Sequence, residues 1–219
     1  MFTGIVQSQA EVISINTENQ LSRLMISVTP SLVSHLEIGA SIAINGVCLT
    51  VVEFHEHLDN AYAIAFDVIA ETLRVTSLGD LSVGSWVNIE RSLKFGDEIG
   101  GHIVSGHVQY KSTLIKKQET PTNTTLYFEC AAAWLKYIFD KGFITVNGAS
   151  LTVGKVETMT LGGIEKNCFS VHLIPETLSR TNLGKLNVSD AVNLEFDQQT
   201  ITIVKTIERL NLSHLNITQ

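Results

Sequence analysis

The stretch SIAINGVCLTV, residues 41–51, returns in the second half of the chain as FITVNGASLTV, residues 143–153. Six of the eleven aligned positions are identical, at a constant offset of 102. In both stretches Asn-Gly lies between two apolar runs, where it supplies the positive φ angles of a tight type I′ turn. Each stretch therefore predicts a β-hairpin. The two hairpins differ at a reactive position, because Cys48 aligns with Ser150.

The repeat extends beyond the hairpins. ETLRVTSLG, residues 71–79, matches ETLSRTNLG, residues 176–184, in six of nine positions at an offset of 105, and GIV at 4–6 aligns with GHV at 106–108. We interpret the change in offset as three extra residues in the first copy between Val51 and Glu71, and we expect them in the variable stretch FHEHLDN at 54–60. The chain is thus a duplicated domain, with predicted limits 1–97 and 98–199 and a tail at 200–219 that belongs to neither copy.

Each copy consists mostly of short segments rich in Val, Ile and Thr, which are typical of strands. In the first copy they predict strands over residues 4–15, 21–28, 41–44, 47–54, 61–68 and 86–93. Short helices are expected within 30–36 and 131–139, ahead of the hairpins, and over 71–76 and 176–181. About six strands in some ninety residues predict an all-β fold of two small closed barrels, an arrangement that leaves no free sheet edges.

Composition excludes several classes of protein. The formal net charge of −7 argues against nucleic-acid binding, which needs Lys and Arg to neutralise phosphates. No apolar run approaches the roughly 20 residues of a membrane span, and no signal peptide is visible, so a cytoplasmic protein is expected. The three cysteines, Cys48, Cys130 and Cys168, lack the spacing of a zinc site or a disulfide framework, which favours reduced thiols.

The tail has a different pattern from the two copies. Ile203, Ile207 and Leu210 recur at helical spacing, with Val204 beside them. A lone helix of this length is marginal in water unless its apolar face is buried. We therefore interpret residues 200–219 as an oligomerisation helix.

The two copies agree at scaffold positions and differ at polar ones. The differing pairs are Ile5 and His107, Gly39 and Lys141, Ser41 and Phe143, Cys48 and Ser150, Asp67 and His172, and Ser92 and Asp197. This pattern is typical of two pockets that bind similar ligands and perform different parts of one reaction. Drift after duplication is the alternative interpretation.

MFTGIV, NGVCLTV, GGHIVSGHV, KGFITVNGASLTVG and LIPETLSRTNLG together resemble the riboflavin synthase family of the alpha-chain type, over residues 1–210. The resemblance implies two tandem six-stranded Greek-key β-barrels and a homotrimer held partly by a C-terminal α-helix. It implies that one molecule of 6,7-dimethyl-8-ribityllumazine gives a four-carbon unit to a second, producing riboflavin and 5-amino-6-ribitylaminouracil. The active site would lie between the first barrel of one subunit and the second barrel of its neighbour.

The resemblance also implies the site residues. The first pocket would comprise Gly4, Ile5, Val6, Cys48, Leu49, Thr50, Asp67, Val68, Ile69, Ala70, Glu71 and Thr72. The second would comprise Gly106, His107, Val108, Lys141, Ser150, Leu151, Thr152, His172, Leu173, Ile174, Pro175, Glu176 and Thr177. The family's polar active-site groups correspond to Ser41, Cys48, His107, Ser150, Thr152 and Asp197. No metal or organic cofactor is implied, and association with lumazine synthase is left open.

The chemistry of these side chains suggests roles. A histidine side chain can act as a general acid or base, so His107 is expected to take part in proton transfer at the lumazine 7-methyl group. Cys48, or a water held near it, would add to the donor ring, and Asp197 would orient or charge-stabilise a partner. The alternatives are a small buried apolar residue for Cys48, a helix C-terminal charge for Lys141, and a metal pair for His102 and His107, which lacks a third ligand.

A protein of another class is the main rival. It is a non-catalytic lumazine or flavin carrier that serves as a bioluminescence antenna, resembles the same family, is monomeric and has a degraded second pocket. In this chain the second half keeps GGHIVSGHV, NGASLTV and LIPETL, and the tail helix is present. These features favour the enzyme.

Overall fold

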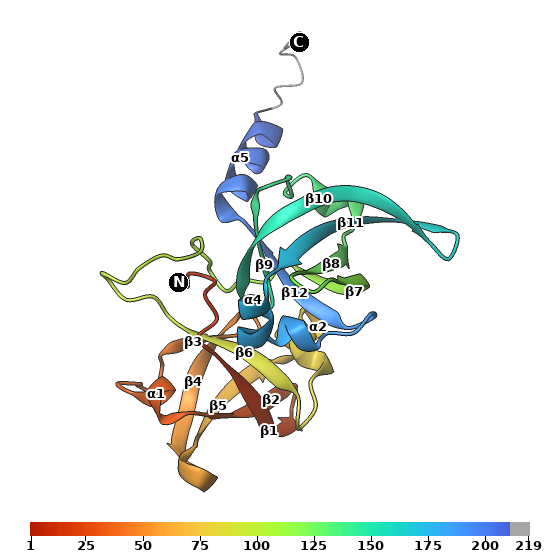
Figure 1. The fold of residues 1–219 in the computed structure, drawn as a ribbon. Coiled ribbons are helices and arrows are strands. Elements are labelled where there is room, and N and C mark those ends of the chain that lie inside the picture. The colour runs from red at the N-terminus through yellow and green to blue at the C-terminus, as the bar shows by residue number, and fades with distance from the viewer. Residues whose placement is uncertain (211–219) are drawn as a thin grey trace.

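The computed structural model describes residues 1–210, which form two barrels with a helix that projects from the second (Figure 1). The first barrel contains β1 (Ser8–Glu18), β2 (Leu21–Val28), α1 (Pro30–Val33), β3 (Ser41–Ile44), β4 (Val47–Glu56), η1 (Leu58–Asn60), β5 (Tyr62–Ile69), α2 (Ala70–Val75), η2 (Ser77–Asp80) and β6 (Trp86–Arg91). The second contains β7 (Tyr110–Glu119), β8 (Thr124–Glu129), α3 (Ala132–Leu135), β9 (Phe143–Val146), β10 (Ala149–Leu161), β11 (Ile164–Leu173), α4 (Pro175–Arg180), η3 (Asn182–Lys185) and β12 (Ala191–Phe196).

Both barrels are closed and have the same strand order. The first runs β1-β2-β5-β4-β3-β6, and the second gives the same order once each strand is replaced by its repeat equivalent. All neighbouring strands are antiparallel, and β5 returns beside β2 as in a Greek key. Bulges follow Val51 in β4 and Val153 in β10, which occupy the same place in the repeat. These bulges bend the strands so that the sheet closes on itself.

The predicted hairpins are confirmed, and their turns meet. Asn45 and Gly46 have φ angles of 46° and 77°, and Asn147 and Gly148 have 46° and 81°, as type I′ turns require. A Cβ atom on Gly46 would lie 2.7 Å from the backbone nitrogen of Gly148. Glycine is therefore needed both for the turn and for the close approach of one barrel to the other.

Buried asparagines bond the two barrels around these turns. Asn88 Nδ2 donates to the carbonyl oxygen of Asn147 at 2.9 Å, and Asn193 Nδ2 donates to that of Asn45 at 2.9 Å. The backbone nitrogen of Ser77 donates to Asn193 Oδ1 at 2.6 Å. The equivalent bond joins the nitrogen of Asn182 to Asn88 Oδ1 at 2.7 Å. The contact obeys an approximate twofold relation between the copies, and the asparagine side chains pair with buried backbone groups.

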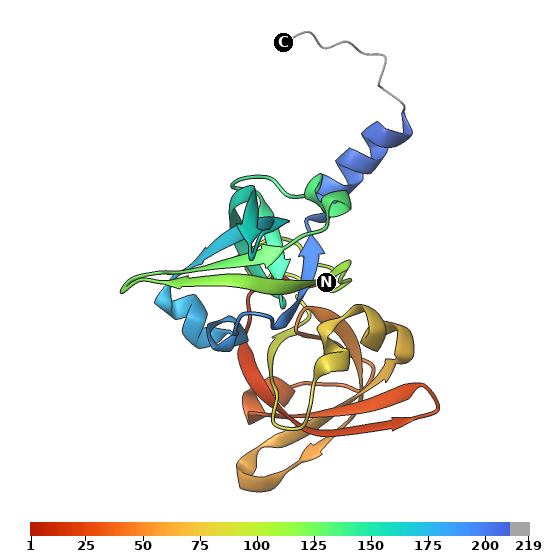
Figure 2. The same ribbon diagram turned by 90° about the vertical axis from the view of Figure 1, so that its right-hand side faces the viewer.

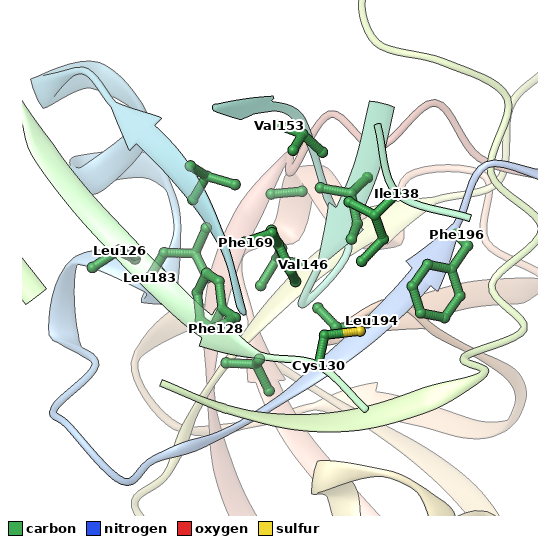
Figure 3. Packing of buried hydrophobic residues seen from close by; sticks show 14 of the residues in the cluster. Leu126, Phe128, Cys130, Ile138, Val146, Val153, Phe169, Leu183, Leu194 and Phe196 are labelled. Atoms are coloured by element: carbon green, nitrogen blue, oxygen red, sulfur yellow. The ribbon is translucent and has the colours of Figure 1, made fainter. Parts of the chain in front are cut away.

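Each barrel encloses its own hydrophobic core. Figure 3 shows the core of the second barrel, where Phe128 and Phe169 pack with ring centroids 5.6 Å apart and Leu194 is fully buried. The core of the first barrel includes Ile26, Ile64 and Phe66. The alternation of buried and exposed residues along the strands places these side chains inside and the charged ones outside.

Two local expectations were wrong. Strand β1 begins at Ser8 and not at Gly4, because residues 4–6 leave the first barrel. The longer copy is the second: Val153 and Glu176 are farther apart in sequence than Val51 and Glu71, and the additional residues extend the β10–β11 hairpin. The predicted short helices correspond to α1, α2, α3 and α4. The domain limits at residues 97 and 199 stay predictions.

The tail forms α5 (Gln198–Arg209), which extends away from both barrels (Figure 2). Asp197 caps its first turn, and the predicted helix residues 211–219 lie outside the described residues. Ile201 is buried against the second barrel, whereas Ile203, Ile207 and Leu210 are 59%, 50% and 62% exposed. Within residues 1–210, no helix is long and apolar enough to cross a lipid bilayer.

Replacement of Asn193 tests the bonds between the barrels. Asn193→Ala removes the donor to Asn45 and the acceptor for Ser77, leaving two buried backbone groups without partners. We expect a loss of about 2–4 kcal/mol in the free energy of unfolding, measured with urea, because each orphaned group costs about 1–3 kcal/mol. Asn16→Ala, at an exposed position, is the control. Equal stability of both variants and the wild type would show that the network contributes nothing.

Candidate active site

Two segments, residues 2–6 and 104–108, cross between the barrels and form the centre of the candidate site. Phe2 and Val104 exchange backbone hydrogen bonds of 2.8 and 3.0 Å, which align the two segments antiparallel. The nitrogen of Ser150 then donates to the carbonyl oxygen of Gly4 at 2.7 Å, and that of Cys48 donates to Gly106 at 2.8 Å. Each hairpin is therefore lined by a segment from the other half of the chain.

This crossing corrects the predicted grouping of residues. We expected segment 4–6 beside Cys48 and segment 106–108 beside Ser150. Instead, Val6 belongs to the core of the second barrel, and Val108 packs against the core of the first. Such an exchange depends on pairing between residues about a hundred positions apart, which repeat alignment does not reveal.

Two buried glutamates hold the crossing segments in place. Glu90 Oε1 accepts from the nitrogen and the hydroxyl of Thr3 at 2.6 and 2.8 Å, and its Oε2 accepts from the nitrogen of Gly4 at 3.0 Å. Glu195 makes the equivalent bonds to Ser105 and Gly106. Burial raises the pKa of Glu90, while the donors from Thr3 and Gly4 act in the opposite direction.

Gly4 and Gly106 allow the segments to approach the hairpins closely. Both have positive φ angles, 73° and 80°. A Cβ atom on Gly4 would lie 2.6 Å from Ser150 Cβ, and one on Gly106 would lie 2.6 Å from Cys48 Cβ. Side chains larger than hydrogen would push the segment off the hairpin.

A cavity of about 140 Å³ lies beside Ser150. It is lined by segment 4–6, by Ala149, Ser150 and Leu151 of the second hairpin, and by Glu176, Thr177, Arg180 and Thr181 at α4. This cavity brings together members of both predicted sets. Larger clefts of about 340 and 500 Å³ lie between the barrels and beside α1, and no predicted catalytic residue lines them.

Several predicted residues have side chains outside the barrels. Asp67 and His172 alternate with buried neighbours, so both side chains point outward. Asp67 accepts two bonds from Arg23, at 2.8 and 3.0 Å, and this hydrogen bonding lowers the pKa of the carboxyl group. His172 Nδ1 is 2.9 Å from Thr125 Oγ1. Asp67 lines a cleft on this outer surface together with Arg23, away from the cavity beside Ser150.

The polar groups expected to be catalytic occupy both halves. Ser41 pairs with Thr50 across β3 and β4, and Thr152 pairs with Phe143 across β9 and β10. His107 is exposed and follows Gly106, so within one chain it lies on the side of Cys48. Asp197 Oδ2 accepts from the nitrogen and the hydroxyl of Thr200, both at 2.8 Å. The carboxylate of Asp197 thus caps α5, a role that the sequence did not indicate.

His102 makes a polar contact in the site that the sequence did not indicate. Its Nδ1 atom lies 2.6 Å from Ser150 Oγ, and its ring is buried between the connecting segment and the second hairpin. In the sequence, its only signal was the five-residue spacing from His107, which suggested metal binding. The contact crosses 48 residues of chain, so no local pattern predicts it.

Lys141 has a left-handed backbone, with a φ angle of 67°, where the first copy has Gly39 at 88°. The alternative interpretation as a helix C-terminal charge is wrong, because α3 ends at Leu135. A side chain in this region costs about 1–2 kcal/mol, which suggests that the lysine side chain is kept for another reason.

Replacement of Lys141 by glycine should stabilise the fold. We expect Lys141→Gly to raise the free energy of unfolding by about 0.5–1 kcal/mol, since glycine adopts positive φ freely but adds entropy to the unfolded chain. Lys141→Ala keeps the backbone cost and should show no gain. Urea unfolding of the three proteins measures the difference, and equal stability of the glycine and alanine variants would contradict backbone strain at this position.

Comparison with known proteins identifies the family of the two repeated domains. The family model described as the lumazine binding domain matches residues 3–92 and 105–197. Riboflavin synthase of Escherichia coli (strain K12) is 45% identical over 211 residues, covering 96% of this chain and 93% of that protein. Riboflavin synthase of Chlamydia pneumoniae is 40% identical over 210 residues, covering 96% of each.

Solved structures share the fold. A crystal structure of LumP complexed with riboflavin has a TM-score of 0.76 and 25% identity, covering 90% of this chain and 100% of that one. LumP complexed with 6,7-dimethyl-8-(1'-D-ribityl) lumazine has the same TM-score and coverage, with 22% identity. The two lumazine-binding matches, together with 40–45% identity over nearly the full length, show that this chain belongs to the riboflavin synthase family.

Proposed function

We propose that the chain acts as a riboflavin synthase. Two molecules of 6,7-dimethyl-8-ribityllumazine bind, and transfer of a four-carbon unit from one to the other gives riboflavin and 5-amino-6-ribitylaminouracil. The observation that carries this proposal is the full-length similarity to curated riboflavin synthases, at up to 45% identity. The LumP complex with riboflavin, at 25% identity, supports a flavin-sized ligand for this fold.

The duplicated fold suits a reaction between two copies of one molecule. Identical substrates need pockets of the same shape, which the repeated strands and hairpins supply. One substrate donates and the other accepts, so the catalytic groups around the pockets must differ. Holding both heterocycles in place converts a bimolecular encounter into a positioned one, worth up to about 7–11 kcal/mol in favourable cases.

We assign the binding residues to two pockets with the crossing taken into account. The first comprises Cys48, Leu49 and Thr50, segment 67–72, and Gly106, His107 and Val108. The second comprises Ser150, Leu151 and Thr152, Lys141, segment 172–177, and Gly4, Ile5 and Val6. The contacts of Gly4 with Ser150 and of Gly106 with Cys48 support this assignment.

We also propose roles for the polar groups. His107 removes or returns a proton at the lumazine 7-methyl group, a role that suits an exposed imidazole. Cys48, or a water beside it, adds to the donor ring, with Ser41 as a polar neighbour. Ser150 and Thr152 contact the second ligand, and Asp197 fixes the start of α5 at the edge of this site.

The assembly that we propose is a homotrimer in which the first barrel of one subunit meets the second barrel of its neighbour. Ile203, Ile207 and Leu210 support it, because they form an exposed apolar stripe on a helix that projects from the second barrel (Figure 2). Association with a lumazine synthase and a cytoplasmic location stay predictions from the family resemblance.

Turnover tests the proposed reaction. Purified protein mixed with 6,7-dimethyl-8-ribityllumazine should produce riboflavin, followed by its absorbance, with two lumazines consumed for each riboflavin. The stoichiometry follows because the donor leaves as 5-amino-6-ribitylaminouracil. An antenna-type carrier would bind the lumazine and change its fluorescence without forming product, and that result would reject the enzyme.

The apolar stripe on α5 tests the trimer. Ile203→Glu together with Ile207→Glu should convert a particle of three chains into single chains of 24.0 kDa, as measured by light scattering, because charges in an apolar contact are poorly solvated. Lys205→Glu, which changes the charge on another face of the same helix, should leave the mass unchanged. A double variant that keeps the mass of the wild type would show that α5 does not hold the subunits together.

A further inference from the structure

His102 lies at the centre of a small polar cluster beside the second hairpin. Its Nδ1 atom is 2.6 Å from Ser150 Oγ, and its Nε2 atom is 3.3 Å from Thr145 Oγ1. The ring stacks on Phe143 with centroids 5.0 Å apart and an interplanar angle of 19°. Its backbone nitrogen donates to Thr3 at 3.1 Å, so the residue is fixed at both main chain and side chain.

The contacts of His102 coincide with the differences between the two hairpins. Of the five positions at which 41–51 and 143–153 differ, two exchange one aliphatic side chain for another, Ile44 for Val146 and Val47 for Ala149. The side chains at the remaining three positions, Phe143, Thr145 and Ser150, all contact the His102 ring. Independent drift does not explain why all three changes meet at one imidazole.

The first copy has a different cover at the same place. Thr145 and Ser150 are cross-strand partners, and their equivalents Ala43 and Cys48 are also paired. In the first copy this pair packs with the fully buried ring of Phe2 and with Val104. The apolar side chains of Phe2 and Val104 thus pack against a thiol and a methyl group in the first copy. In the second copy the His102 imidazole forms hydrogen bonds with two hydroxyl groups.

The bonding pattern favours one direction for the Ser150 proton. Within residues 1–210, Nε2 of His102 is the sole hydrogen-bond partner of Thr145 Oγ1, so the Thr145 proton is satisfied when Nε2 accepts it. A neutral imidazole then carries its proton on Nδ1 and donates to Ser150 Oγ. The Ser150 proton is left free to point into the adjoining cavity, which Gly4, Leu151 and Thr177 also line.

We infer that His102 is a positioning residue of the second pocket, which holds Ser150 so that its hydroxyl donates to an oxygen or nitrogen acceptor of the bound heterocycle. This inference rests on the proposed function and specifies how Ser150 contributes to the second pocket. Burial lowers the pKa of His102, while the Asp197 and Glu195 carboxylates act in the opposite direction, and a lowered pKa keeps the ring neutral as the pattern requires.

Four variants test the inference through kcat/KM on the dimethyl-ribityllumazine and through riboflavin affinity by fluorescence titration. His102→Phe keeps a stacking ring but loses both nitrogens, and His102→Asn keeps a donor near the position of Nδ1. Ser150→Ala and the double variant His102→Phe with Ser150→Ala complete the set. We expect His102→Phe and Ser150→Ala each to lose about tenfold, the effect of one hydrogen bond of about 1.4 kcal/mol, and His102→Asn to stay within about threefold.

The double variant distinguishes positioning from simple packing. If His102 acts through Ser150, the double variant loses no more than Ser150→Ala alone, because coupled residues are not additive. Losses that multiply, or a His102→Phe variant equal to the wild type, would overturn the inference. Should His102→Phe fail to unfold cooperatively on heating, His102→Ala replaces it in the same comparison.

A control variant, His57→Gln, and the measurement of riboflavin affinity distinguish a failure of this inference from a failure of the proposed function. His57→Gln changes an exposed histidine ahead of η1 and should leave both quantities unchanged. A wild-type protein that forms no riboflavin would reject the proposed reaction. The riboflavin affinities of the variants would then still decide whether His102 positions Ser150.

Discussion

The close approach of the two Asn-Gly turns is the constraint on which the rest of the structure depends. Gly46 and Gly148 meet with no room for a side chain, and the surrounding asparagines bond each barrel to the other. Because the turns are also the tips of the two hairpins, this contact fixes the hairpins relative to one another. The crossing segments then align along them through the backbone bonds of Gly4 and Gly106.

Because of the crossing, each hairpin is lined by a segment from the other half of the chain. Glu90 of the first barrel anchors the segment that lines the second hairpin, and Glu195 of the second barrel anchors the segment that lines the first. Each carboxylate satisfies three donors on a tight segment, which rigidifies backbone that regular strand pairing does not hold. Replacement of Glu90 should therefore disturb the second hairpin, and replacement of Glu195 should disturb the first.

Much of the fold could be predicted from the sequence because its signals are local. Asn-Gly between apolar runs predicted the hairpins, and Val- and Ile-rich segments predicted the strands, with β2 and β3 found at the expected residues. The repeat alignment identified which residues are equivalent. It did not reveal which segment contacts which hairpin. The alignment of the two copies is the same whether each segment packs in its own barrel or crosses to the other one. The contact of His102 with Ser150 was missed for the same reason.

The site was predicted as a set of residues, and the structure adds what surrounds each of them. Asp67 appeared as a candidate ligand contact, yet its carboxylate is paired with Arg23 on the outer surface, which strand alternation alone would have indicated. Asp197 was predicted as a catalytic carboxylate, and the structure shows that it caps α5, so a variant at this position would remove the cap as well as the proposed catalytic group.

The comparison of Cys48 with Ser150 shows how duplication produced unequal chemistry on an equal scaffold. The residues that set the hairpin shape, including Ile42 and Leu49 with their equivalents Ile144 and Leu151, are unchanged between copies. The cover over the reactive position differs: Phe2 and Val104 pack beside the thiol, and His102 bonds to the hydroxyl. A thiol packed against apolar side chains remains a polarizable group without a fixed hydrogen bond. A hydroxyl can rotate its proton, and a neighbouring hydrogen-bond partner restricts the direction in which that proton points. The two hairpins therefore share a backbone scaffold but not a set of polar groups, as the proposed reaction between two identical molecules with different roles requires.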